Sequence, residues 1–199
     1  VACGNFLCSG TSGSCPTSCA GPADCVPGAT CAANVCTQQH IVFVSSTAST
    51  GLLTDAATQH ARCTTLAAAA GFTTGTFKAW LSDETYTPAG DTAFTGHSTA
   101  WFLVDGTKVA DSWADLTDGS LDALIDLDET NKAQIAKQVV TGTSANGTLG
   151  ASNCSNWDDP SVSAFSIHGD TANATLNGWT DKGVTTCNGQ RRIYCFQVL

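Results

Sequence analysis

The sequence lacks several features that define whole classes of protein. It has no methionine in 199 residues, so we expect that a leader, and whatever else preceded Val1, was removed from the translated chain. Only eight residues are Lys or Arg and the net charge is −9, which argues against nucleic acid, polyanions and anionic membranes as main partners. No uninterrupted apolar run approaches the roughly 20 residues that cross a bilayer. We therefore expect a soluble chain without membrane insertion.

The motifs of common enzyme classes are absent as well. There is no Gly-x-Ser-x-Gly elbow, His-Glu-x-x-His, P-loop or dinucleotide-binding glycine pattern. Gly96-His97-Ser98 places a histidine beside a serine, but neighbours in sequence point in different directions and need a third residue to orient them. A solvated loop is the favoured interpretation of this triplet. The sequence therefore predicts a protein that is not an enzyme and requires no cofactor.

Cysteine, in contrast, is abundant, with 11 residues. Metal-binding ribbons usually have paired Cys-x-x-Cys knuckles, and none occurs here, so the cysteines predict disulfides in a secreted protein, extracellular or at a cell surface. Residues 1–38 are expected to form a separate module that only disulfides can hold together, because they include almost no large apolar side chain. Its cysteines are Cys3, Cys8, Cys15, Cys19, Cys25, Cys31 and Cys36. Their number is odd, so one thiol is free, or pairs with the main domain, another subunit or a cysteine lost in processing.

The larger domain expected over residues 39–199 is organised around one helix. Thr54 or Asp55 can cap its amino end and Gly71 can close its carboxyl end. Between them the apolar residues recur at helical spacing, and Cys63 is one of them. A cysteine on the buried face of a helix needs a partner in the core. The late candidates are Cys154, Cys187 and Cys195.

Strands are predicted before and after this helix. Residues 41–44 form a continuous apolar run, and residues 77–81 alternate as a half-buried strand does. Asp105-Gly106 separates two short apolar runs and is a hairpin signal. The chain ends in an apolar strand over residues 192–198. Short strands, one helix near the start and long loops predict an α+β domain.

The order of these motifs over residues 40–199 resembles a known family. A strand and a Ser/Thr/Gly loop lead into the cysteine-bearing helix, which is followed by the run Thr-Phe-Lys-Ala-Trp-Leu-Ser from Thr76 and by the hairpin. The second half matches through Trp157 after Cys154, Trp179 before Cys187, and the ending Arg-Arg-Ile-Tyr-Cys-Phe. This arrangement resembles the endostatin domain of collagens, and more closely the bacterial domains akin to it, which share the C-type-lectin-like fold. The cysteine-rich module resembles small modules that precede other domains in secreted bacterial proteins.

The resemblance implies a C-type-lectin-like domain with a mixed, mostly antiparallel sheet and one long amino-terminal helix. It also implies nested disulfides, Cys63 with Cys195 and Cys154 with Cys187, each contributing on the order of 2–4 kcal/mol. Heparin and zinc binding do not carry over from endostatin, because this chain is acidic and its four histidines stand alone in the sequence. Calcium-dependent sugar binding does not carry over either, because the chain has neither Glu-Pro-Asn, Gln-Pro-Asp nor Trp-Asn-Asp.

One stretch is a candidate ligand-binding site. Asn156, Trp157, Asp158 and Asp159 offer three oxygen-bearing side chains beside an aromatic ring, a combination that can hold a sugar through stacking and hydrogen bonds. The competing interpretation is that Trp157 occupies a core position. Trp80, Trp101, Trp113 and Trp179 are interpreted as core or near-core aromatics, and His60 as a packing residue on the helix.

Calcium is the candidate ion, because Asp126, Asp128 and Glu129 lie in an acidic run and hard cations prefer carboxylate oxygens. The glycine of a calcium loop is missing there, so a solvated acidic face is the favoured interpretation. Three triplets fit the N-glycosylation pattern. They begin at Asn146, Asn153 and Asn173.

Two functions are compatible with these observations. The first is a secreted, non-catalytic, lectin-like recognition protein that binds a glycan or an extracellular protein partner at the cell surface or in the extracellular matrix. The second is a structural subunit of an extracellular, glycosylated fibre or surface layer that self-assembles through the odd cysteine of the module. The Thr-rich, Lys-poor composition suits the second function, and the resemblance favours the first.

Overall fold

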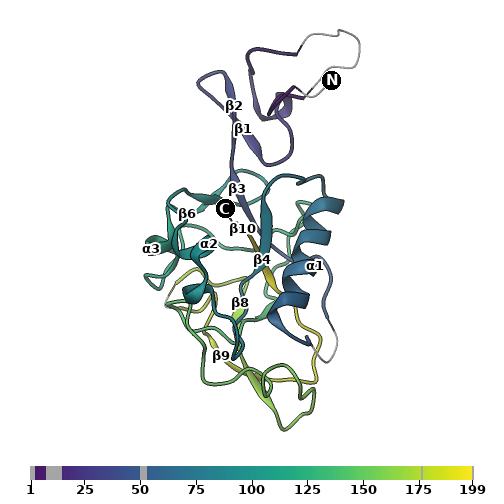
Figure 1. Cartoon of the computed structure of the whole chain (residues 1–199), viewed down its shortest axis with the longest axis vertical. Helices are drawn as coiled ribbons and strands as arrows, with labels where there is room; N and C mark the ends of the chain where they lie inside the picture. The colour runs from purple at the N-terminus through teal and green to yellow at the C-terminus, as the bar shows by residue number, and fades with distance from the viewer. Residues whose placement is uncertain (1–2, 8–14, 50–52, 176, 199) are drawn as a thin grey trace.

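A computed structural model describes residues 3–7, 15–49, 53–175 and 177–198 of the chain (Figure 1). Cys8, one of the predicted module cysteines, lies outside these residues. The chain forms a small amino-terminal module, at the top of Figure 1, and a larger body below it. Within the described residues, no helix is long and apolar enough to span a membrane.

The module is held together by sulfur. It contains the short helix η1 (Pro22–Asp24) and the antiparallel hairpin of β1 (Ala29–Ala32) and β2 (Val35–Gln38). Its buried apolar cluster consists of half-cystines, with Phe6 packed against it. The disulfides are Cys3–Cys15, Cys19–Cys31 and Cys25–Cys36. Disulfides therefore replace an apolar core here, as the composition predicts.

A five-stranded sheet forms the centre of the body, in the order β4-β10-β3-β5-β6. These strands are β3 (His40–Val44), β4 (Thr76–Ala79), β5 (Trp101–Phe102), β6 (Lys108–Ala110) and β10 (Tyr194–Val198). The first and last of them in sequence, β3 and β10, are antiparallel neighbours, whereas β3 and β5 run parallel. The predicted strands before the helix, after the helix, around Asp105-Gly106 and at the chain end are all present.

The helix α1 (Ala56–Ala69) packs beside β4 and covers one face of this sheet (Figure 1). Its cap is Asp55, whose side chain accepts a hydrogen bond from the Thr58 N–H at 2.6 Å. Gly71 ends it at a φ of 92°, a conformation that glycine adopts without strain. Cys63 is bonded to Cys195 of β10, so the helix is covalently attached to the middle of the sheet. This is one of the two pairs that the resemblance implies.

Apolar side chains lie on both faces of the sheet because successive strand residues point in opposite directions. On the face of α1, Ile41 and Phe43 of β3 join Cys63 and Cys195. The opposite face carries a cluster of aromatic rings. It comprises Trp80, Phe94, Trp101, Trp179, Tyr194 and Phe196, all fully buried. The core interpretation of Trp80, Trp101 and Trp179 is therefore confirmed, and Trp113 packs at the edge of this cluster.

A second, three-stranded sheet lies in the lower part of the body, in the order β7-β8-β9 (Figure 1). Its strands are β7 (Gln138–Val140), β8 (Phe165–Asp170) and β9 (Gly183–Thr186). The connecting loops contain the short helices η2 (Pro88–Gly90), α2 (Thr92–Thr95) and α3 (Trp113–Leu116). A disulfide joins Cys154 to Cys187, the second implied pair. The mixed α+β class is confirmed.

Candidate functional site

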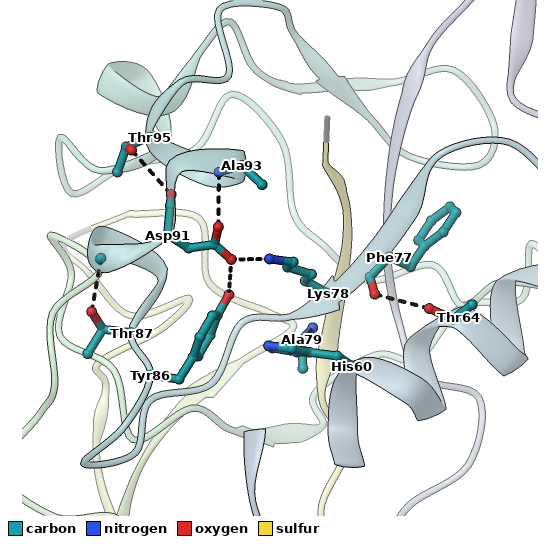
Figure 2. A network of polar contacts seen from close by, with 11 residues as sticks. His60, Thr64, Phe77, Lys78, Ala79, Tyr86, Thr87, Asp91, Ala93 and Thr95 are labelled. Atoms are coloured by element: carbon teal, nitrogen blue, oxygen red, sulfur yellow. Dashed lines mark hydrogen bonds and ion pairs between the residues drawn. The ribbon is translucent and has the colours of Figure 1, made fainter. Parts of the chain in front are cut away.

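A cleft of about 330 Å³ opens between the first turns of α1, the strand β4 and the loop that follows Asp83. Its lining residues are Asp55, Ala56, Ala57, His60, Lys78, Asp83, Thr85 and Tyr86. Figure 2 shows a network of polar contacts in which Lys78 of β4 and Tyr86 of the loop are joined through Asp91, with His60 of α1 beside them. A second hollow of about 280 Å³ lies along the same loop and shares Asp83, Thr85 and Tyr86 with the first. Residues of this loop thus line both spaces.

Asp91 is the centre of this network (Figure 2). Its Oδ2 forms an ion pair with Lys78 Nζ and accepts a hydrogen bond from the Tyr86 hydroxyl at 2.9 Å, while its Oδ1 caps α2 by accepting from the Ala93 N–H at 2.9 Å. Burial acts to raise the pKa of Asp91, but these bonds outweigh it, with Lys78 first among them, and lower the pKa. Burial and the Asp91 charge together raise the pKa of Tyr86. Lys78 and Asp91 therefore form a charged pair, and Tyr86 keeps its proton.

His60 is held in one neutral form. Its Nδ1 accepts a hydrogen bond from the Ala79 N–H at 3.0 Å, so the ring proton lies on Nε2. Burial, and next the charge of Lys78, lower the pKa of His60 to about 4. The Nε2 atom is buried without a hydrogen-bond partner in the described part of the chain, and the ring stands edge-to-face against Tyr86 at 4.5 Å between centroids. In the neutral ring the Nδ1 lone pair is therefore used by Ala79, and the Nε2–H is enclosed by the protein.

The two carboxylates of the cleft both cap the helix. Asp83 Oδ2 accepts from the Ala56 N–H at 2.9 Å, and its Oδ1 accepts from the amides of Thr85 and Tyr86, each at 2.8 Å, and from the Thr85 hydroxyl at 2.7 Å. Burial acts to raise the pKa of Asp83, but these bonds outweigh it and lower the pKa. Asp55 uses one oxygen for its own cap. The carboxylate of Asp83 is thereby committed to joining the loop to the start of α1.

The predicted ligand-binding stretch adopts an unusual backbone. Four successive residues, Cys154 to Trp157, have φ values of 58°, 53°, 62° and 68° and form one left-handed turn. The Trp157 N–H bonds to the Asn153 carbonyl at 2.8 Å, and the Asp159 N–H bonds to the Cys154 carbonyl at 3.0 Å. This conformation costs about 1–2 kcal/mol per residue. The Cys154–Cys187 disulfide and the burial of Trp157 hold the turn in place.

This turn is bonded to the loop beside the cleft. The Trp157 ring is only 1% exposed and its Nε1–H donates to the Ser82 carbonyl at 3.1 Å, so it cannot stack on a sugar. The indole fills the core beneath the loop, which is the competing interpretation of Trp157 given by the sequence. Asn156 Oδ1 accepts from the Glu84 N–H at 2.8 Å. Asn156 and Trp157 therefore fix the backbone on both sides of Asp83.

Asp158 and Asp159, the other two residues of the predicted stretch, do not reach the cleft. Asp158 is exposed, and Asp159 accepts from the Ser161 N–H at 2.9 Å. Asp159 instead lines a separate space near the Cys154–Cys187 disulfide, of about 10 Å³. That volume is enough for roughly one water molecule.

The calcium candidates are engaged in structural hydrogen bonds. Asp128 accepts from Thr130, Lys132 and Gln134, and these bonds outweigh burial and lower its pKa. Glu129 accepts from the backbone and hydroxyl of Ser46. Asp126 does not converge with them into a group that could hold an ion, among the residues described. The acidic side chains of Asp128 and Glu129 therefore tie the loop to itself and to the end of β3.

Two other groups of potential metal ligands occur in the described residues. The half-cystines of the module are already bonded in disulfides, and Asp111, Asp115 and Asp122 gather near Lys108. The Lys108 ammonium lies 2.8 Å from Asp111 and 2.9 Å from Asp122. Its single positive charge offsets part of the negative charge of the three carboxylates and is shared between two of them.

The three N-glycosylation triplets differ in exposure. Asn146 is exposed at a turn, where its side-chain oxygen accepts from the Thr148 hydroxyl at 2.7 Å. Asn153 and Asn173 are partly buried, and each accepts a backbone N–H two or three residues ahead. Asn146 is therefore the most accessible of the three.

No family model matches the chain, and no curated protein matches it either. The cleft is the feature of the structure that bears on function. Among its residues the sequence singles out His60, as a packing residue, and Asp55, as a cap. Lys78, Tyr86 and Asp91 carry no spacing signal because they come from separate elements that only the folded chain brings together.

Proposed function

We propose that the chain is a secreted, non-catalytic recognition protein whose body, residues 39–199, has a C-type-lectin-like fold. Three features support this fold. The first and last strands of the body are neighbours, α1 is bonded to the last strand through Cys63 and Cys195, and the Cys154–Cys187 loop is nested inside that bond. Several disulfides fit an extracellular location.

The observation that carries the proposal is the composition of the cleft. Three of its polar groups are poorly suited to catalysis. His60 is neutral with a buried Nε2, and Asp83 is saturated with hydrogen bonds. Tyr86 keeps its proton in a hydrogen bond to Asp91. A reaction needs a nucleophile or a base whose pKa suits the working pH. The volume of the cleft lies in the range of small-ligand sites, which is roughly 300–1,000 Å³. We therefore propose that it holds part of a glycan or of an extracellular protein.

A binding survey tests this function. The purified, fully oxidised chain is applied to an array of glycans and to a panel of extracellular matrix proteins, with and without chelator, and reduced, unfolded chain serves as the control. Saturable binding of the folded chain alone to any member supports the proposal. Binding to none, or chemical conversion of a bound glycan seen by mass spectrometry, overturns it.

The alternative, a subunit of a fibre or surface layer, depends on the odd cysteine of the module. Cys8 lies outside the described residues, so this function stays a prediction. Gels of native material with and without reducing agent distinguish covalent oligomers from monomers.

A further inference from the structure

We infer that the cleft between α1, β4 and the Asp83 loop binds an uncharged sugar and that this binding needs no calcium. The inference rests on the proposed recognition function and narrows its ligand to one chemical class. It follows from the charges that line the cleft, from the hydrogen-bonding groups left over after the internal network is satisfied, and from the apolar wall.

An anionic ligand is disfavoured by the charges around the cleft. Among the residues that the structure describes, Lys78 is the one cationic side chain in the lining, and its ammonium is already paired with Asp91. Asp55 and Asp83 line the same cleft. A sulfate, uronate or sialate would have to break the ion pair and approach carboxylates of its own sign at close range.

The position over an aromatic ring where a cationic ligand would bind is already occupied in this cleft. Ammonium groups bind over the face of an aromatic ring within about 6 Å of its centroid. Lys78 Nζ lies 5.8 Å from the centroid of the Tyr86 ring, so the protein supplies this cation from its own chain. The Asp83 oxygens, which could otherwise pair with a ligand ammonium or coordinate a divalent ion, accept four hydrogen bonds. This saturation is also the reason to expect binding without calcium.

The groups that remain match the hydroxyls of a neutral sugar. An ammonium has three N–H donors, and Lys78 uses one of them on Asp91. One oxygen of Asp55 has no hydrogen bond within the described residues. A hydroxyl that accepts from Lys78 and one that donates to Asp55 would each complete a charge-assisted hydrogen bond. The exposed methyl group of Ala57 and the part of the Tyr86 ring that faces the cleft can pack against the C–H face of a sugar.

Filling the cleft tests the inference without touching the polar network. Ala57 is exposed on α1 and lines the cleft, so Ala57→Trp places an indole in it. The matched control is Ala68→Trp, an exposed alanine of the same helix about 16 Å along its axis. Circular dichroism and the melting temperature report whether both variants fold as the parent does.

The ligands are neutral, acidic and amino-sugar oligosaccharides at equal concentration, with and without EDTA. We expect the parent and Ala68→Trp to bind neutral oligosaccharides equally in both buffers, and Ala57→Trp to bind them at least about tenfold more weakly. Unchanged sugar binding by a folded Ala57→Trp, a preference for charged sugars, or loss of binding in EDTA overturns the inference and leaves the recognition function standing. Binding of extracellular proteins but of no sugar also overturns the inference and leaves the recognition function standing. If neither sugars nor proteins bind, the inference and the recognition function are both wrong.

Discussion

Removing the bond between α1 and β10 should cost more stability than removing the bond nested within it. The Cys63–Cys195 bond closes a sequence separation of 132 residues, and the Cys154–Cys187 bond one of 33. With the inner bond intact, the effective outer loop is roughly 100 residues long, which corresponds to about 4.7 kcal/mol of lost loop entropy in the unfolded chain. The inner loop corresponds to about 3.8 kcal/mol.

Burial increases the expected difference between the stability costs of removing the two disulfides. Cys63 and Cys195 are both 0% exposed, whereas Cys154 and Cys187 are each 7% exposed. Replacing the outer pair by alanine therefore leaves a sulfur-sized void in the middle of the core, which adds a cavity cost. We expect the double variant Cys63→Ala/Cys195→Ala to lose about 5 kcal/mol, a large part of the roughly 5–15 kcal/mol by which domains are stable.

The assay is equilibrium unfolding in urea, followed by the fluorescence of the buried tryptophans. The Cys154→Ala/Cys187→Ala variant is the comparison, and the Cys25→Ala/Cys36→Ala variant is the control, because its bond lies in the module and should leave the unfolding of the body unchanged. If the inner pair costs as much as the outer pair or more, our account of how the body is stabilised is wrong.

Three further changes probe single residues. The pKa of the buried His97 ring is lowered to about 4, by burial first and then by the charge of His40. The stability that the neutral ring contributes is therefore complete above about pH 6.5 and is lost as the pH falls to about 4, a loss of at most about 3 kcal/mol. His97→Phe should reduce this pH-dependent loss of stability, as measured by thermal melts. A Cβ on Gly147, at a φ of 81°, would lie 2.5 Å from the Trp113 ring, so Gly147→Ala should cost about 1–3 kcal/mol in urea unfolding. Asn156→Gly keeps a residue that tolerates the left-handed backbone but removes the acceptor of the Glu84 N–H. Hydrogen exchange of the Glu84 amide should become faster, while the global stability changes by no more than about 1 kcal/mol. Exchange at the parent rate would contradict the anchoring role of Asn156.

Short-range chemistry made part of this fold predictable. Asp55 and Gly71 mark the ends of α1 because capping and left-handed closure depend on one residue each. The apolar runs of β3 and β10 are clear because both strands are buried on two faces. The strand β8 has no such signature. Its Phe165 is exposed while Ser166 and His168 are buried, which reverses the usual relation between burial and polarity.

The candidate site was harder to predict from the sequence than the fold. Trp157 and Asn156 have side chains typical of sugar binding, but the left-handed turn directs one into the core and the other to the Glu84 amide. Non-glycine residues give no local signal for such a turn, because the disulfide and the packing around it impose the conformation. His60, Lys78 and Asp91 likewise meet only once α1, β4 and α2 are assembled. These residues come together only in the tertiary structure, so the sequence alone gives no signal for it.

The bond between α1 and β10 also affects what proteolysis does to the protein. Any single cut between residues 63 and 195 leaves two pieces that remain covalently joined, because each piece keeps one of the two sulfurs. The residues that line the cleft all lie between Asp55 and Tyr86. A protein clipped in the long loops of its second half would therefore keep the cleft-lining chain and its attachment to the sheet, and would run as one species until a reductant separated the fragments.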